Sequence, residues 1–114
     1  MAANPVTPSL PLQIGIERSN DEIVARCNGK LTNETTDQFK SEVKPLVTQT
    51  KRLVLDLSDL AYMDSSGLGT LVGLYASAKS SACELKLINL GPRVKELLRI
   101  TKLINVFEPF GEHL

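Results

Sequence analysis

The sequence has a single histidine, His113, and only two cysteines, Cys27 and Cys83. A structural zinc site takes about four nitrogen or sulfur ligands, so this chain cannot provide one, and no metal or cofactor is expected. Two cysteines without CxxC spacing do not make a disulfide scaffold, and each is expected to be a small buried hydrophobe in a strand. One histidine near the end of the chain also excludes most acid–base and nucleophile–base pairs of enzymes.

The sequence has no excess of charge of either sign, because Lys and Arg total 13 and so do Asp and Glu. Nucleic-acid-binding proteins usually carry a basic excess, so direct nucleic-acid binding is not expected. No apolar run approaches the roughly 20 residues of a membrane-spanning helix. Residues 1–9 lack the basic start and the apolar stretch of a signal peptide. We therefore expect a cytoplasmic protein with no membrane span.

The chain has 114 residues, of which 42% are hydrophobic. That length is enough for one compact domain and too short for two. Residues 1–9 hold two prolines among small polar residues and are expected to be a flexible N-terminal tail. Residues 10–114 are expected to form the single domain.

Apolar periodicity predicts the element order β-β-α-β-α-β-α-β. Turn residues between the first two strands predict an antiparallel hairpin. The strand–helix–strand units that follow require parallel pairing, so the sheet is mixed and the fold is a small α/β (α+β) domain. The strands are expected over 10–16, 22–27, 53–57, 84–89 and 106–110, and the helices around 39–47, over 67–80 and from 91–92 onward.

Local features refine the first helix and its approach. Asn28-Gly29 is expected to end the second strand, and Thr32 or Asn33 to cap the helix through a side-chain oxygen. Pro45 lies late in the apolar pattern of this helix. Because an interior proline removes a backbone hydrogen bond, a kink or break is expected near Lys44.

The most informative segment is 59–69, DLAYMDSSGLG, which joins a buried strand to a helix. The first N–H groups of a helix favour an anion, and Ser65 or Ser66 can cap them. The glycines here have the spacing GxGxxxG instead of the dinucleotide-binding GxGxxG, the serines have no accompanying base, and the loop has no lysine. Two interpretations remain: a plain helix cap, or a serine that is itself phosphorylated close to Asp64.

The helix after this segment has two distinct faces. One is apolar and expected to face the core, with Leu68, Leu71, Val72 and Tyr75. The adjacent stripe contains only small residues: Gly69, Gly73, Ala76, Ser77 and Ser80. Such a stripe allows the close approach of a partner's backbone, and it equally allows tight packing within the domain itself.

With this order of elements, residues 53–58 (LVLDLS) and 63–69 (MDSSGLG) resemble the signature of STAS domains. More closely, the chain resembles the free-standing anti-sigma-factor antagonists (anti-anti-sigma factors) of bacteria. The similarity runs over about residues 12–110, with further support from 29–31 and 94–107. It implies a single STAS-type domain with a mixed four- to five-stranded sheet and about three helices largely on one face.

The resemblance also implies a function. In that family the unphosphorylated protein binds an anti-sigma factor that is itself a serine kinase, which frees a sigma factor. Phosphorylation by the kinase ends the binding, and a metal-dependent serine phosphatase reverses it. Such a protein is a kinase substrate and not an enzyme. The alternative within the same fold is a STAS subunit of a lipid-transport or stressosome-like assembly that acts without serine phosphorylation.

The resemblance places the phosphorylated serine at Ser66. The residues that it implies for the phospho-loop and the partner-binding surface are Asp64, Ser65, Gly67, Leu68, Gly69, Gly73 and Thr32. Thr32 and Lys30 stand where family members often carry an acidic residue, and both are expected to line the surface that meets the partner.

Overall fold

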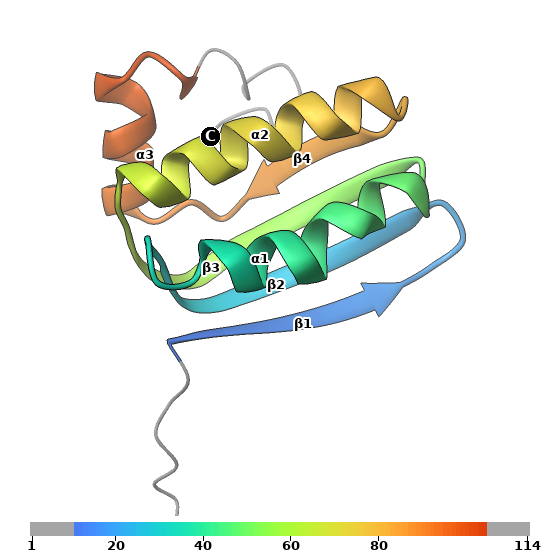
Figure 1. Cartoon of the computed structure of the whole chain (residues 1–114), viewed down its shortest axis with the longest axis horizontal. Coiled ribbons are helices and arrows are strands. Elements are labelled where there is room, and N and C mark those ends of the chain that lie inside the picture. Colours follow the sequence, from blue (N-terminus) through green and yellow to red (C-terminus); the bar gives the residue numbers. More distant parts are fainter. Residues whose placement is uncertain (1–10, 105–114) are drawn as a thin grey trace, which may run out of the picture.

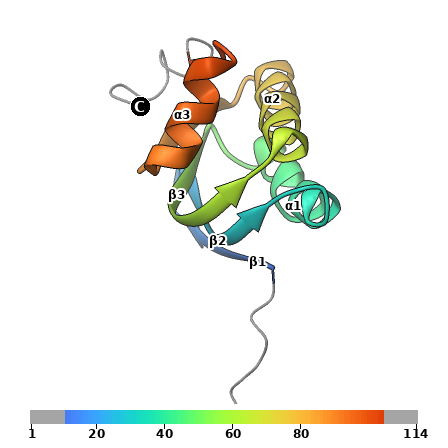
Figure 2. The same cartoon turned by 90° about the vertical axis from the view of Figure 1, so that its left-hand side faces the viewer.

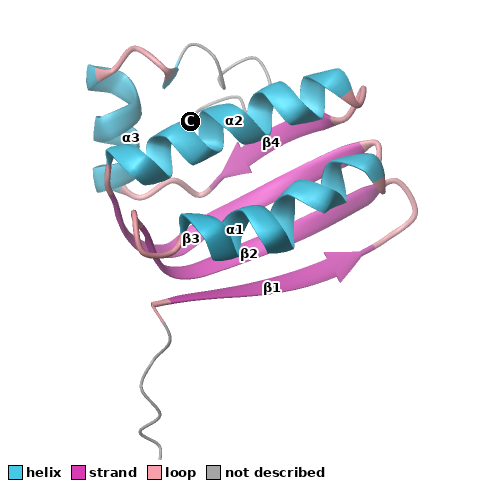
Figure 3. Ribbon diagram, in the orientation of Figure 1, coloured by secondary structure: helices cyan, strands magenta, loops and turns pink. Residues whose placement is uncertain are grey.

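The computed structural model describes residues 11–104, so the expected tail over 1–9 and the expected last strand over 106–110 lie outside the described residues. A four-stranded sheet carries its helices largely on one face (Figures 1 and 3). The strands are β1 Leu12–Arg18, β2 Glu22–Leu31, β3 Arg52–Met63 and β4 Glu84–Ile88. The helices are α1 Thr36–Val43, the short 3-10 helix η1 Lys44–Thr48, α2 Ser65–Ser80 and α3 Pro92–Ile100.

The sheet has the order β1-β2-β3-β4. β1 and β2 form the predicted antiparallel hairpin, whereas β2 with β3 and β3 with β4 pair in parallel. The prediction of a mixed sheet that starts with a hairpin is therefore confirmed. Because the parallel strands β2 and β3 end at the same edge, the connections that leave them for α1 and α2 lie beside each other (Figure 2).

The core lies between the sheet and the helices. Alternate residues of β3, Leu53, Leu55 and Leu57, are fully buried and belong to the same core cluster as residues of α1 and α2. Phe39 of α1 and Leu71 of α2 are equally buried and pack in the same cluster. On α2 the buried apolar face contains Leu68, Leu71 and Leu74, whereas Val72 and Tyr75, expected in the core, are only half-buried.

The prediction that Asn28-Gly29 ends the second strand is wrong, because β2 continues to Leu31. Register shifts after Arg26 and Gly29 carry the strand past this dipeptide. Gly29 has a φ of +118°, which favours glycine, and an ideal Cβ there would lie 2.2 Å from the carbonyl oxygen of Pro11. Glycine therefore permits a bulge here, so the strand does not stop.

The prediction for the first helix is half confirmed. Thr35, not Thr32 or Asn33, precedes α1, and it makes no side-chain cap bond to the helix. Its hydroxyl instead donates to the carbonyl oxygen of Lys30 at 2.9 Å and accepts from the Thr32 N–H at 2.9 Å. The expected break is present, because α1 ends at Val43 and Pro45 lies in the first turn of η1.

Candidate functional site

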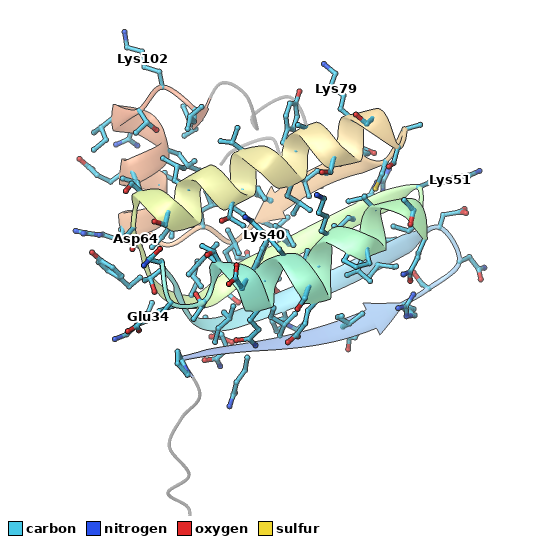
Figure 4. The ribbon with its side chains drawn as sticks, viewed as in Figure 1. Glu34, Lys40, Lys51, Asp64, Lys79 and Lys102 are labelled. Atoms are coloured by element: carbon cyan, nitrogen blue, oxygen red, sulfur yellow. The ribbon has the colours of Figure 1, made fainter. Side chains whose placement is uncertain are left out.

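The candidate site lies where the end of β3 meets the start of α2, next to the loop between β2 and α1. The Asp64 N–H donates to the carbonyl oxygen of Leu31 at 3.3 Å, which joins the ends of the two strands. Figure 4 shows Asp64 and Glu34, one from each connection, at the same end of the molecule. Parallel pairing of β2 with β3 thus brings together residues that are about 30 positions apart in the chain.

Asp64 organises this end of the molecule. Its backbone is extended, and its Oδ1 accepts a hydrogen bond from the Gly67 N–H at 2.9 Å, so it is the N-cap of α2. Its Oδ2 accepts from the Asn33 N–H at 3.2 Å, across the gap between the two connections. The bond from Gly67, with the weaker help of Asn33, holds the pKa of the Asp64 carboxyl below its ordinary value. The carboxylate therefore carries its charge at neutral pH.

Because Asp64 caps α2, neither serine does. Ser65 is exposed at the first position of the helix, and Ser66 is half-buried at the second. Within residues 11–104 the Ser66 hydroxyl has no hydrogen-bond partner, while its backbone carbonyl accepts from the Thr70 hydroxyl at 2.9 Å. The interpretation of the serines as plain caps is therefore wrong. Ser66 presents a hydroxyl at the positive end of a helix of 16 residues.

The other expected site residues are buried at the start of α2, exposed along α2, or part of the β2–α1 loop. Gly67 and Leu68 are buried, and an ideal Cβ on Gly67 would lie 2.1 Å from the carbonyl oxygen of Leu31, so they position the loop from inside. Gly69 and Gly73 are exposed along α2, and nothing lies within 4 Å of an ideal Cβ on either. Thr32 is half-buried in the β2–α1 loop, where its hydroxyl accepts from the Glu34 N–H at 3.3 Å.

The structure adds residues that sequence reasoning did not place at this site. Asn33 ties the β2–α1 loop to Asp64 through a backbone N–H, a contact that no residue type indicates. Lys40 and Lys44 of α1 and η1 line a surface groove together with Ser66 of α2. Because residues four apart lie on the same face of a helix, their spacing in the sequence indicates that the two lysines are neighbours, but it does not indicate that they lie near Ser66.

A second polar cluster lies on the sheet and serves a different purpose. Asp56 of β3 accepts from Arg26 Nε at 3.3 Å, from Asn89 Nδ2 at 3.1 Å and from the Ser58 N–H at 3.0 Å. Burial raises the pKa of this carboxyl, but the three donors outweigh burial and bring the pKa below its ordinary value. Because its partners come from β2 and from the residue after β4, Asp56 ties three strands together.

Residues 11–104 contain neither a cluster of metal-ligating side chains nor a membrane-spanning helix. No three His, Cys, Asp or Glu side chains of this part of the chain gather closely enough to hold a metal ion. None of its helices is both long and apolar enough to cross a membrane. Cys27 is buried in β2 as expected, and burial, helped by Asp56 and Glu42, raises the pKa of its thiol to about 12.

Comparisons with known proteins agree on one family. A family model described as the STAS domain matches residues 13–114. An anti-sigma F factor antagonist of Paenibacillus polymyxa is 30% identical over 97 residues, which cover 83% of each chain. An anti-sigma-B factor antagonist of Listeria monocytogenes is 35% identical over 95 residues, which cover 81% of this chain and 82% of the relative.

Solved structures show the same fold. The anti-sigma factor antagonist SpoIIAA in its unphosphorylated form matches with a TM-score of 0.70 at 22% identity, covering 87% of this chain and 85% of that one. The phosphorylated form of SpoIIAA from Bacillus matches with a TM-score of 0.68 at 20% identity, covering 87% and 88%. At this level of identity the two structures establish the arrangement of strands and helices.

Proposed function

The chain belongs to the STAS domain family, and we propose that it is an anti-sigma-factor antagonist whose binding is switched off by phosphorylation of Ser66. Two relatives at 30% and 35% identity are named as antagonists of anti-sigma factors, and each matches over more than four fifths of its length. These relatives do not favour the alternative of a lipid-transport or stressosome-like subunit. The role proposed for the chain is regulatory, with an anti-sigma factor as its partner.

One observation carries the assignment of Ser66 as the switch. Its hydroxyl has no partner within residues 11–104, because Asp64 provides the cap that a serine would otherwise give. A kinase can therefore reach and modify the hydroxyl without first breaking a hydrogen bond that the helix needs. In the reaction the Ser66 oxygen forms a bond to the γ-phosphorus of ATP, the bond from that phosphorus to ADP breaks, and the hydroxyl proton is released.

The charge of the phosphate explains how phosphorylation would prevent the partner from binding. Phosphorylation adds about −1.5 to −2 charges at neutral pH. Asp64 is already ionised nearby, and the N–H groups of Gly67 and Leu68 are already bonded to Asp64. Because part of the start of α2 is occupied in this way, the helix offsets only a fraction of the new charge. The remainder faces outward, where a partner fitted to a small neutral serine would meet a bulky dianion.

The proposed partners follow from this cycle. The first is an anti-sigma factor with serine-kinase activity, which binds the unmodified surface around Asp64, Ser65 and Ser66 and then modifies it. The second is a metal-dependent serine phosphatase, which removes the phosphate and restores binding. Neither step requires a catalytic group of this chain, so it acts as a binding module and a substrate.

The experiment is phosphorylation of the full chain by each serine-kinase anti-sigma factor of the source organism, followed by intact-mass analysis and peptide mapping. We expect one added phosphate on the parent chain and on Ser65→Ala, and none on Ser66→Ala. In a binding assay, Ser66→Asp is expected to weaken the complex, whereas Ser66→Ala is expected to bind without being switched off. Phosphate on Ser66→Ala, or none on the parent with any of these kinases, would contradict the proposal.

A further inference from the structure

A groove runs along the surface between α1 and α2 and begins at Ser66. Its first part has a volume of about 470 Å³ and lies beside Ser66, Gly69 and Gly73. A second part of about 580 Å³ continues past Ala76 toward the end of α2. Both parts are lined by Lys40 and Lys44, so they form one continuous groove. We infer that this groove seats an acidic helix of the anti-sigma factor, an inference that rests on the function proposed above.

The charges of the groove determine the chemistry of its occupant. Among residues 11–104, its lining includes no Asp or Glu, and the charged side chains that line it are Lys40 and Lys44. Both lysines are exposed, and neither forms an ion pair within the described part of the chain. Figure 4 shows Lys40 between the two helices. By contrast, Arg26 and Arg52 on the sheet are each paired with two carboxylates. The groove therefore offers two uncompensated positive charges to a negatively charged partner.

The shape of the groove favours a helix. Its exposed apolar lining includes Pro45 and Ala76, which line the second part together with the lysines, whereas the lining residues Phe39 and Leu74 are almost fully buried. An amphipathic helix fits such a groove by placing its apolar residues on the floor and its charged residues along the rim. Because the walls are helices and not a free sheet edge, an added strand would find no backbone groups to pair with.

The glycines of α2 support the same conclusion. Glycine weakens the interior of a helix relative to alanine. Nothing lies within 4 Å of an ideal Cβ on Gly69 or on Gly73, so internal packing does not require glycine at either position. The sequence left open whether this stripe packs inside the domain or receives a partner. Among the described residues, nothing packs closely against Gly69 or Gly73, so the stripe does not serve internal packing at these two positions. The space beside both glycines is part of the groove.

The position of Ser66 couples the groove to the switch. Ser66 lies in the lining together with Lys40 and Lys44. A phosphate there adds about −1.5 to −2 charges, comparable in size to the two positive charges of the lysines. Phosphorylation would thus remove the attraction for an acidic helix and, at the end nearest Ser66, replace it with repulsion.

The first test reverses the charge of the groove. The probes are the serine-kinase anti-sigma factors of the source organism, and calorimetry measures their affinity for the full unphosphorylated chain at low and high salt. We expect the double variant Lys40→Glu/Lys44→Glu to bind about tenfold more weakly or worse, with a smaller difference at high salt. Lys51→Glu is the matched control, since Lys51 is an exposed lysine outside the groove, and it should bind like the parent (Figure 4).

The second test fills the groove without changing its charge. Gly69→Ala and Gly73→Ala each add one methyl group to its α2 wall. We expect both to raise the melting temperature and yet to weaken binding by several fold. Gly15→Ala on β1 is the control, because an ideal Cβ there also meets nothing within 4 Å and lies outside the groove. A rise in melting temperature shows that weaker binding does not come from unfolding.

The outcomes of these tests distinguish a failure of the groove proposal from a failure of the proposed function. If the parent binds a kinase and the lysine and glycine variants bind it equally well, the groove is not the seat and the proposed function stands. If the parent binds none of the kinases, both ideas are overturned. Should Lys40→Glu/Lys44→Glu fail to fold by circular dichroism, Lys40→Ala/Lys44→Ala takes its place, with the same salt-dependent loss expected.

Discussion

Replacing Gly67 with alanine is expected to destabilise the domain, although it places a better helix former in α2. An ideal Cβ at Gly67 would lie 2.1 Å from the carbonyl oxygen of Leu31 and 2.9 Å from its carbonyl carbon, well short of the 3.4 Å at which ordinary contact begins. Both atoms belong to the backbone of β2, so no side chain can simply turn away. Either the end of β2 or the start of α2 must move.

The magnitude follows from two opposing effects. Forcing a backbone shift in a packed region costs about 1–3 kcal/mol. The higher helix propensity of alanine offsets up to about 1 kcal/mol of that loss. We therefore expect a net loss of about 1–2 kcal/mol of unfolding free energy, measured by urea denaturation. For a domain of this size that corresponds to a fall in melting temperature of roughly 3–10 °C.

The same helix provides the control. Gly69→Ala and Gly73→Ala meet no atom within 4 Å and should each stabilise the domain by about 0.5–1 kcal/mol. The reasoning is refuted if Gly67→Ala is as stable as the parent, or if all three substitutions shift stability in the same direction. Either result would mean that α2 does not pack against the end of β2 at Gly67.

Three further predictions concern the core and the carboxylates. Phe39→Ala should lose about 3–5 kcal/mol in urea denaturation, since the Phe39 side chain of α1 is fully buried; a loss below 1 kcal/mol would place it outside the core. The pKa values of Asp56 and Asp64 are lowered by folding, so their contribution is complete above the unfolded value of about 4 and is lost as pH falls through the folded values. Melting temperature should therefore drop below about pH 4, and less steeply in Asp56→Asn. Cys27, with a thiol pKa of about 12 and a buried position, should resist a thiol reagent at pH 8 until the chain is unfolded; rapid labelling of the native chain would contradict this.

Patterns that depend on neighbours in the chain predicted much of the fold. Alternation and turn residues were enough for the β1–β2 hairpin, and Pro45 was enough for the break after α1. The lengths of β2 and β3 were not predictable in this way. β3 runs to Met63 because its second half pairs with the extended part of β2, beyond the end of β4. Strand pairing is a property of two distant segments, and periodicity in either one alone does not reveal it.

The N-cap of α2 could not be predicted from the local sequence either. Asp64, Ser65 and Ser66 are all good N-cap residues, so local preference does not choose between them. The choice depends on Asn33, whose N–H holds the second oxygen of Asp64 from another loop. Residue type alone therefore allows a serine cap, whereas the contact between Asn33 and Asp64 favours Asp64 as the cap.

The identity of the cap bears directly on the proposed switch. If Ser66 capped α2, phosphorylation would remove a hydrogen bond that the helix start needs, and loss of binding could not be separated from local unfolding. With Asp64 as the cap, the proposed phosphorylation of Ser66 would leave the bond between Asp64 and the Gly67 N–H in place. The side chain that stabilises the start of α2 is then a different one from the side chain that is proposed to be phosphorylated. A phosphorylated chain should accordingly keep its helical circular dichroism and a melting temperature within a few degrees of the parent while it loses its partner; coincident loss of structure and binding would show that the two are not separate.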